Sequence, residues 1–464
     1  MNAEQKKLED SVIESSNEKL KGKEKFSYGL GNLAANLLIT TANTFIIYFY
    51  TEIAGIAVAT VGTMLMIARI FDGATDLGMG LLVDKTRSKY GKARPWLLWM
   101  AVPYGLAIII LFSAPELGDT GKIIYAFATY TLALSFIYTA TNVPFNSMIG
   151  TLTQNQIERG QLSVFRTAFG FIGALAVSML TLPIVEFFGD GKKGWTLMAI
   201  TYGVLAIAIY LFVFKNTRER VFSELTDKDN KKDTIPIKEG VKTLFKNKYW
   251  LITISIMLIS FINSGLNGVN VFYAQYILGD SNYVGAMGFA SFLPIIGMML
   301  FMGPLMKKFS KRDLTIAGTV VTILSSFIIM IDPTSFTIVM SGLIIRGIGG
   351  APMLAASFAM LGDTVDYGEW KTGIRNEGIT FSAGTFGEKV GTGIGGMLLG
   401  VLMGIGGYVG GQSTQTAEAL SAIKAVFIYV PMFVGVIAII LLLFYKLDKE
   451  HPQIVADLQV RKEK

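Results

Sequence analysis

The sequence predicts an all-α integral membrane protein with twelve transmembrane helices. Hydrophobic residues make up 52% of its 464 positions and charged residues only 16%, and the mean hydropathy is positive. Apolar stretches of about 20 residues, the length that crosses a bilayer as a helix, recur along nearly the whole chain. Short polar loops separate them. A water-soluble globular domain is therefore a poor description of this chain.

The apolar stretches are too long and too continuous for the strands of an outer-membrane barrel, which alternate in hydropathy over about ten residues. Helices, whose backbone hydrogen bonds close internally, are the remaining way to cross the lipid. The expected spans are residues 28–52, 58–83, 95–114, 123–149, 161–188, 195–214, 249–279, 284–306, 313–331, 335–361, 378–408 and 419–446.

The loops predict the orientation in the membrane. The N-terminal tail, residues 1–26, is polar and lysine-rich and has no apolar core that would make it a signal peptide. Basic residues cluster in the loops after the second and eighth spans, so these loops are expected in the cytoplasm. The alternate loops, including the one around Glu52, are short and acid-leaning. Twelve spans then place both termini in the cytoplasm, with a C-terminal tail over residues 447–464.

The composition narrows the chemistry. The net charge of +7 is concentrated in the predicted cytoplasmic loops and tails, which topology alone explains, so no nucleic-acid partner is expected. There is no cysteine, which excludes disulfides and thiolate metal sites. The single histidine, His451, lies in the polar C-terminal tail, so a proton relay must use carboxylates. No phosphate-binding loop and no cofactor are expected, and the energy must come from an ion gradient or from the substrate itself.

A charged linker, residues 215–248, divides the spans into an N-terminal bundle, 27–214, and a C-terminal bundle, 249–446. In each half a basic loop follows the second span, and similar segments follow the fourth. Six plus six spans, with a binding site at their interface near the middle of the membrane, is the architecture of the major facilitator fold.

Acidic residues inside the second span indicate ion coupling. Asp72 and Asp76 are four residues apart and share one helix face, with Arg69 one turn earlier. Each charge at this depth costs about 2.5–3.5 kcal/mol on insertion scales, so all three need partners or water. Two carboxylates one turn apart can coordinate a small cation or hold a proton. The alternative is a structural ion pair between Arg69 and Asp72.

Other polar residues inside the spans are candidates for binding a hydroxyl-rich ligand. Amides and phenols on one helix face can bind sugar hydroxyls, or can instead hydrogen-bond neighbouring helices. Two buried cations could bind sugar hydroxyls or a carboxylate, or could balance the aspartates of the second span. The stripes are Tyr138, Asn142 and Asn146 in the fourth span and Asn263, Asn267, Asn270 and Tyr273 in the seventh, and the cations are Arg166 and Lys389.

Aromatic residues gather at the outer end of the first span. They are Phe45, Tyr48 and Tyr50. Tyrosine and other amphipathic rings are common where a helix meets the lipid headgroups. An interfacial aromatic belt is the simplest expectation for them.

Four stretches together resemble the glycoside-pentoside-hexuronide cation symporter family of the major facilitator superfamily. The resemblance extends over residues 25–446. Its densest parts are Phe-Asp-Gly-Ala-Thr-Asp at 71–76, residues 84–96, Tyr-Thr-Ala-Thr-Asn-Val-Pro-Phe at 138–145, and residues 362–377, which begin Gly-Asp-Thr-Val-Asp-Tyr-Gly-Glu-Trp-Lys. The location that this implies is the inner membrane of a bacterial cell.

The resemblance implies a cation site at Asp72 and Asp76, with Thr139 as a further oxygen ligand. Thr75 stands between the aspartates, where a well-studied member of the family has asparagine. This difference favours a proton as the coupling ion, with Na⁺ held at Asp72 and Asp76 as the alternative.

The resemblance also implies residues that bind the sugar. Tyr138, Arg166 and Lys389 fall on matching positions. Asn36, Asn142 and Asn146 replace charged or aromatic residues of that well-studied member. The expected substrate is therefore a sugar or glycoside, without the galactoside specificity of that member.

A charged segment after the tenth span is expected to be a cytoplasmic gate. Exposed ion pairs contribute only about 0–1 kcal/mol each, a size suited to pairs that form and break during a cycle. The segment is expected as a loop, and its residues are Asp363, Asp366, Tyr367, Glu369, Lys371 and Arg375.

These observations predict secondary active symport of a sugar or glycoside with a cation by alternating access, by a monomer in the lipid bilayer. Two alternatives share this fold, namely a cation-coupled lysolipid transporter and a sugar sensor that no longer transports. An enzyme is not expected, because a membrane-embedded transferase needs convergent acid, base or metal ligands near the lipid interface.

Overall fold

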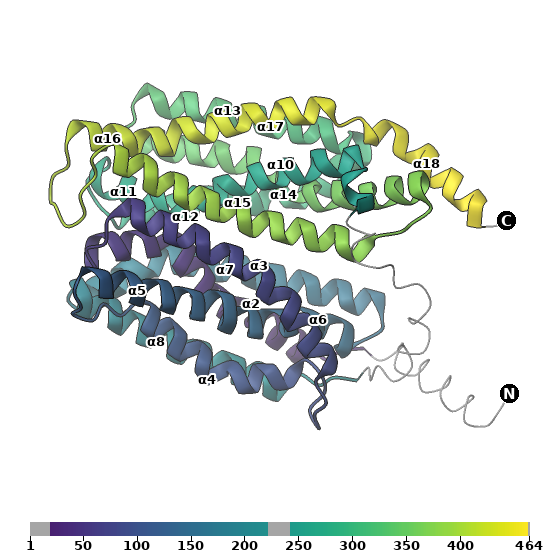
Figure 1. Cartoon of the computed structure of the whole chain (residues 1–464), viewed down its shortest axis with the longest axis horizontal. Helices are drawn as coiled ribbons and strands as arrows, with labels where there is room; N and C mark the ends of the chain where they lie inside the picture. The colour runs from purple at the N-terminus through teal and green to yellow at the C-terminus, as the bar shows by residue number, and fades with distance from the viewer. Residues whose placement is uncertain (1–18, 221–241, 463–464) are drawn as a thin grey trace. The chain divides into compact units, whose positions relative to one another are not determined.

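The computed structural model describes residues 19–220 and 242–462. Within these ranges every regular element is helical, and twelve helices are long and apolar enough to cross a membrane (Figure 1). The predicted all-α fold with twelve spans is therefore confirmed. The predicted N-terminal tail, 1–26, and the predicted linker, 215–248, lie partly outside the described residues.

Several spans are built from consecutive helical segments that differ in winding. The first six spans are α2 (Gly22–Tyr48) with η1 (Phe49–Ile53), α3 (Val58–Lys85), α4 (Arg94–Leu111), α5 (Asp119–Tyr130) with η2 (Thr131–Tyr138) and α6 (Thr139–Leu152), α7 (Gln156–Phe187), and α8 (Gly191–Asn216). The next six are α10 (Lys248–Gly265) with η3 (Leu266–Gly268) and α11 (Val269–Tyr276), α12 (Tyr283–Lys308), α13 (Lys311–Ile331), α14 (Phe336–Thr372), α15 (Glu377–Ile405), and α16 (Ala417–Lys424) with η4 (Ala425–Tyr429) and α17 (Val430–Phe444).

Side chains at the helix starts explain several boundaries. Asn155 accepts hydrogen bonds from the backbone amides of Ile157 and Glu158 at the start of α7. Ser310 and Thr416 do the same for α13 and α16. These caps satisfy amide groups that have no partner inside the helix.

The tenth span is longer than its apolar stretch. α14 continues as far as Thr372 and ends at Gly373, whose φ of 73° is the left-handed conformation that glycine favours after a helix. The predicted loop over Asp363–Lys371 is therefore wrong, because these charged residues form the last turns of α14. Hydropathy marks the boundary of the lipid, whereas backbone hydrogen bonding continues beyond it.

Three spans contain π-helical segments, η1, η2 and η4. A π-helical turn holds an extra residue and is frequent at functional sites. η2 ends at Tyr138 and α6 begins at Thr139. The π-helical segment therefore lies directly before Thr139.

The chain divides into two compact units. One contains Met1–Ala42 and Phe71–Asp233, and the other contains Asn43–Ile70 and Thr234–Lys464. The end of the first span and the beginning of the second thus group with the C-terminal helices. The predicted boundary between bundles 27–214 and 249–446 stays a prediction.

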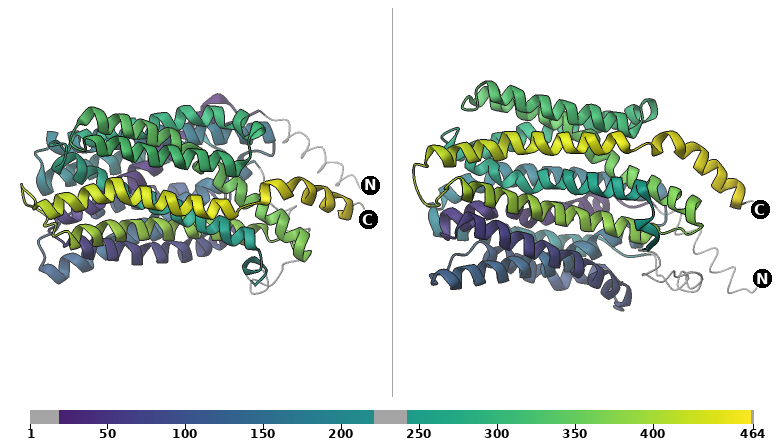
Figure 2. Two further views of the ribbon diagram at one scale, coloured as in Figure 1. Left: turned by 90° about the horizontal axis from the view of Figure 1, so that it is seen from above. Right: turned by 45° about the horizontal axis from the view of Figure 1, so that its top comes forward.

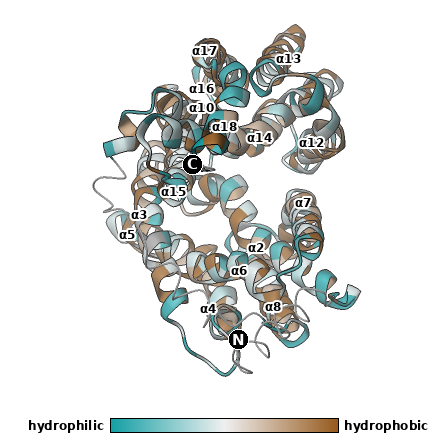
Figure 3. Ribbon diagram, turned by 90° about the vertical axis from the view of Figure 1, so that its right-hand side faces the viewer, coloured by the Kyte–Doolittle hydropathy of each residue, from teal (hydrophilic) through white to brown (hydrophobic). Residues whose placement is uncertain are grey.

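Small residues let the helices approach closely within each unit, as is common in membranes. In the first unit, α4 and α8 lie side by side with Gly105 against Gly203, where a Cβ on either glycine would lie 2.7 Å from the other's carbonyl oxygen (Figure 3). In the second unit, α10 and α15 meet at Gly265 and Gly395 (Figure 1). Larger side chains at these positions would separate the helices.

Large apolar side chains are exposed along the spans. Phe187, Leu300 and Ile331 are examples, with 83%, 78% and 75% of their surface exposed. Such exposure is unfavourable in water but matches a hydrocarbon environment. The exposed surface is thus the lipid-facing side that the predicted membrane location requires.

The predicted C-terminal tail, 447–464, is helical over most of its length. α18 (Leu447–Lys462) follows α17 after a short break and extends beyond it toward the C-terminus (Figure 2). Ile454 and Leu458 of this helix are buried in a cluster that includes Tyr249 and Tyr367. α18 is therefore packed against the second unit.

Candidate functional site

The first unit brings together two of the predicted cation ligands. The Thr139 hydroxyl, at the start of α6, donates a hydrogen bond of 2.9 Å to Oδ1 of Asp76 in α3. Asp72 lies one turn earlier on α3 and is 2% exposed. Two carboxylates and a hydroxyl supply oxygen ligands of the kind that bind a small hard cation, and the carboxylates can also carry a proton.

Thr75 has a different orientation. Its hydroxyl donates to the backbone carbonyl of Asp72 at 3.0 Å, so it contacts its own helix. Within the described ranges, no group of three or more histidine, cysteine, aspartate or glutamate side chains is placed to hold a metal ion. Asp72, Asp76 and Thr139 stay the predicted ion ligands, and the structure brings Asp76 and Thr139 into contact.

The polar stripe of the fourth span continues from η2 into α6. Tyr138, Asn142 and Asn146 are each partly exposed, and Pro144 lies within α6 beside them. Oδ1 of Asn146 is buried and has no hydrogen-bond partner among the described residues. A buried amide oxygen without a partner is costly unless a ligand or water fills its place.

A polar cluster joins α2 to α7 within the first unit. Asn32 donates a hydrogen bond of 2.9 Å to the backbone carbonyl of Arg166. The Arg166 guanidinium lies close to the Tyr28 phenol, whose hydroxyl donates to the Phe145 carbonyl at 3.1 Å. The Asn36 amide donates to the Asn32 carbonyl at 2.8 Å, and its oxygen accepts from Thr40 at 2.7 Å. The predicted residues Asn36 and Arg166 are thus linked through Asn32.

Sequence reasoning missed Tyr28 and Asn32. A signal was present, because Tyr28, Asn32, Asn36 and Thr40 are spaced by four and form one face of α2. This spacing is the same as that of the stripe in the fourth span. Applied to the first span, it would have identified both residues.

The remaining predicted sugar residues belong to the second unit. Asn263 lies in α10 with a buried Oδ1 that has no hydrogen-bond partner in the described part of the chain, and Asn267 is exposed in η3. Lys389 is partly buried in α15, which packs against α10. Glu388, its partly buried neighbour inside the same span, was not predicted. An ionisable side chain at this depth is itself a candidate functional residue.

Arg69 also belongs to the second unit. It is 7% exposed, and its guanidinium donates a hydrogen bond of 2.6 Å to Oδ1 of Asn43. A Cβ on Gly393 of α15 would lie 3.0 Å from Arg69 Cβ. Arg69 therefore links the first span to the second and packs against α15.

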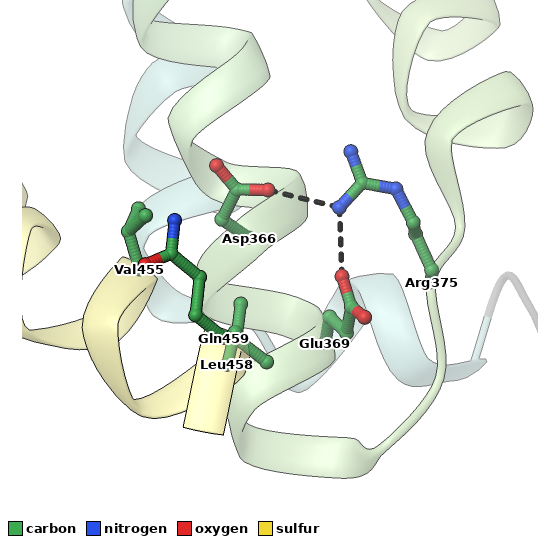
Figure 4. Close-up of a pocket in the computed structure, with 6 residues that line it drawn as sticks. All are labelled: Asp366, Glu369, Arg375, Val455, Leu458 and Gln459. Atoms are coloured by element: carbon green, nitrogen blue, oxygen red, sulfur yellow. Dashed lines mark hydrogen bonds and ion pairs between the residues drawn. The ribbon is translucent and has the colours of Figure 1, made fainter. Parts of the chain in front are cut away.

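The predicted cytoplasmic gate is an ion-pair cluster at the end of α14 (Figure 4). Arg375 Nη1 lies 2.9 Å from Oδ1 of Asp366 and 2.7 Å from Oε2 of Glu369. Hydrogen bonding to Glu369, with Asp366 beside it, raises the pKa of the Arg375 guanidinium. Arg375 therefore remains a fixed positive charge in this cluster.

Two other predicted gate residues take different roles. Lys371 lies 5.6 Å from the centroid of the Tyr367 ring and donates to the backbone carbonyl of Lys246 at 3.4 Å. Tyr367 is buried and packs edge-on against Tyr249. Tyr367 is thus a packing residue in this structure.

α18 and α13 complete the cluster, and neither was predicted to take part. Lys311 of α13 forms an ion pair with Asp363. His451 Nε2 lies 3.1 Å from Oδ2 of Asp366 and 3.6 Å from Oδ1 of Asp363. A cavity of about 440 Å³ lies where Asp366, Glu369 and Arg375 face Val455, Leu458 and Gln459 of α18 (Figure 4).

Comparison with known proteins shows the family of this chain. The family described as MFS/sugar transport protein matches residues 27–449. The isoprimeverose transporter of Lactiplantibacillus pentosus is 34% identical over 94% of this chain and 91% of its own length. The inner membrane symporter YicJ of Escherichia coli is 31% identical over 89% of each chain.

Solved structures share the fold. A bacterial homologue of the human lysosomal transporter Spinster superposes with a TM-score of 0.66 at 15% identity, covering 93% of this chain and 97% of its own. A D-xylose-proton symporter gives a TM-score of 0.65 at 11% identity, covering 91% and 97%. The chain therefore belongs to the MFS/sugar transport family, among the glycoside-pentoside-hexuronide cation symporters.

Proposed function

We propose that this protein imports a sugar or glycoside together with a cation, by alternating access across a bacterial inner membrane. The observation that carries this proposal is the contact of Thr139 with Asp76, one turn from the buried Asp72. Buried carboxylates are costly in a membrane unless they have a function. Coupling to an ion gradient supplies that function and also the energy for transport.

The coupling ion is proposed to be a proton, with Na⁺ as the alternative. The Thr139 hydroxyl contacts Asp76, whereas the Thr75 hydroxyl donates to a backbone carbonyl of its own helix. Asp72, Asp76 and Thr139 supply the oxygen ligands for a small cation, whereas a carboxylate binds a proton without further ligands. Ion binding would organise the polar face of η2 and α6, which starts beside Thr139.

The substrate is proposed to be a neutral or acidic glycoside. Amides and phenols dominate the polar faces of α2 and α6 in the first unit, where Arg166 supplies a cationic group, and Lys389 is a proposed sugar residue of the second unit. Relatives include the isoprimeverose transporter and a glucuronide carrier protein homolog of Escherichia coli. Hydrogen bonds to sugar hydroxyls, with one or two charge-assisted contacts, match these side chains.

Uptake into inverted and right-side-out membrane vesicles tests the proposal. Labelled isoprimeverose, a glucuronide and lysophospholipid would be offered with a proton or a sodium gradient imposed separately. The proposal expects accumulation of a glycoside that depends on the proton gradient. Accumulation of lysophospholipid alone would favour a lipid carrier, and binding of a glycoside without accumulation would favour a sensor.

The proposal also includes the orientation in the membrane and the oligomeric state. Both termini are proposed to lie in the cytoplasm, because the basic loops follow the second and eighth spans. The protein is proposed to act as a monomer. The ion-pair cluster of α13, α14 and α18 is then on the cytoplasmic side, where a gate is required.

A further inference from the structure

Glu52, in η1 at the end of the first span, is held by three donors. Oε1 lies 2.9 Å from the Tyr276 hydroxyl and also accepts from the Tyr408 hydroxyl, and Oε2 accepts from the Gly411 backbone amide at 2.8 Å. The donors come from α11 and from the loop between α15 and α16, more than 200 positions along the chain. Hydrogen bonds to a carboxylate are about twice as strong as neutral ones.

An aromatic cluster surrounds this carboxylate. The Tyr48 ring lies 5.6 Å from Phe272, Phe272 lies 5.3 Å from Tyr408, and Tyr408 lies 5.8 Å from Tyr276. Nearby, Phe45 and Tyr50 are 0% and 1% exposed. The expected interfacial belt is therefore wrong for Phe45 and Tyr50, because their side chains are packed inside the protein.

The start of the second span, in α3, packs against α15, and small residues line this contact. A Cβ on Gly62 would lie 2.8 Å from the carbonyl oxygen of Gly396, and one on Gly404 would lie 3.0 Å from Ala59 Cβ. Residues 43–70 thus meet α15 through close backbone approach. Close approach of this kind favours helix association by van der Waals packing, and the hydrogen bonds of Glu52 add polar contacts at the end of this interface.

Residues 43–70 are joined at both ends to residues of the first unit, yet they pack within the second. We propose that Glu52, with Tyr276, Tyr408 and Gly411, forms the clasp of an outer gate that must open to admit substrate. The role as a gate rests on the proposed transport function, and its placement on the outer side of the membrane rests on the predicted topology. Releasing Glu52 exposes the carboxylate to water, so opening replaces protein donors by solvent.

The absence of cysteine from the natural chain provides a direct test. Ile47, one turn before Thr51, is 3% exposed, and an Ile47→Cys reporter would be shielded while the gate is closed. Its labelling by a membrane-impermeant maleimide would be timed in right-side-out vesicles. Glu52→Gln or Tyr408→Phe should speed labelling by about tenfold or more, because a hydrogen bond to a charged group is lost.

Glu116→Gln is the matched control. Glu116 lies in another predicted outer loop, where it forms only an exposed pair with Lys192 at 3.6 Å, so the same change of charge should leave labelling unaltered. Labelling that stays slow in both Glu52→Gln and Tyr408→Phe would overturn the clasp. Labelling that occurs in inside-out vesicles but not in right-side-out vesicles would overturn the assignment of the clasp to the outer side.

A disulfide tests whether the contact must open. A Cβ on residue 404 would lie 3.0 Å from Ala59 Cβ, which is shorter than the roughly 3.5–4.5 Å found in disulfides, so the two segments must move slightly apart to form the bond. Oxidation of Ala59→Cys/Gly404→Cys should stop uptake and reduction should restore it, while each single variant is unaffected. Full uptake by the crosslinked protein would overturn the gate. Maleimide labelling requires no substrate, so it judges the clasp even where the proposed substrate is wrong.

Discussion

The Thr139 hydroxyl donates a hydrogen bond of 2.9 Å to Oδ1 of Asp76, which joins α6 to α3 at the proposed ion site. The residue before it, Tyr138, ends the π-helical segment η2 and begins the polar stripe. An ion bound at Asp76 and a sugar bound at Tyr138 would therefore act on adjacent residues of one helix. In the proposed function, this adjacency would couple ion binding to sugar binding.

Thr139→Val should weaken ion coupling with little loss of stability. Valine keeps nearly the same shape but removes a hydrogen bond to a charged group, which contributes about 1.5–3 kcal/mol. The half-saturating ion concentration for uptake should rise by about tenfold or more. Thr141→Val is the control, because the Thr141 hydroxyl donates within its own span, to the carbonyl of Ile137 at 2.9 Å. Equal effects of the two substitutions would contradict the assignment.

Arg166→Lys should lower sugar affinity. Lysine keeps the charge but lacks the planar fork of arginine, so the contact with Tyr28 and a bidentate contact with sugar cannot both persist. The KM for sugar should rise by about tenfold, while the ion dependence stays the same. Arg159→Lys, nearer the start of α7, is the control, since Arg159 bonds the carbonyls of Thr153 and Gly150. An unchanged KM in Arg166→Lys would remove this residue from the sugar site.

Asp363→Asn should destabilise the end of α14. The substitution breaks the pair with Lys311 and the contact with His451, and the Asp363 side chain is only 9% exposed. Loss of such hydrogen bonds to a charged group should cost about 1–3 kcal/mol, which lowers the melting temperature in detergent. Asp119→Asn removes a fully exposed carboxylate and should leave the melting temperature unchanged. A comparable decrease of the melting temperature in Asp119→Asn would show that net charge, and not this cluster, determines stability.

Arg375 predicts a stabilisation that does not vary near neutral pH. Hydrogen bonding to Glu369 raises the pKa of Arg375. A group with a raised pKa stabilises the folded protein fully at any pH below its ordinary pKa, and this stabilisation is lost only as the pH rises past the pKa in the folded protein. For arginine even the ordinary pKa is far above neutral pH. The difference in melting temperature between the natural protein and Arg375→Gln should therefore be constant from about pH 6 to about pH 9. A difference that disappears within this interval would assign the effect to another group.

Most of the fold could be predicted from local signals in the sequence. Twelve apolar stretches fix the number of spans, because each must satisfy its backbone within the lipid. Asp72, Asp76 and Thr139 were found from spacing and from family resemblance, and the structure brings Asp76 and Thr139 into contact. The polar spacing of Tyr28, Asn32 and Asn36 is equally local, and it predicts one polar face of α2.

Contacts between distant segments could not be predicted. α18 contains Pro452 and few apolar residues, and its stability comes from the burial of Ile454 and Leu458 against Tyr249 and Tyr367. The Glu52 carboxylate and the Tyr408 hydroxyl are 356 positions apart. One sequence shows that both residues are polar and lie near the ends of spans, but not that they meet.

The most direct test of the central claim is ion-driven accumulation of glycoside by the Asp72→Asn and Asp76→Asn variants. Labelled glycoside would be measured in right-side-out vesicles with an imposed proton gradient, beside exchange of the same sugar at equilibrium. We predict that both variants lose accumulation while retaining exchange or sugar binding, because an amide keeps the shape but cannot take up or release a proton at this site. Undiminished accumulation by both variants would contradict the account.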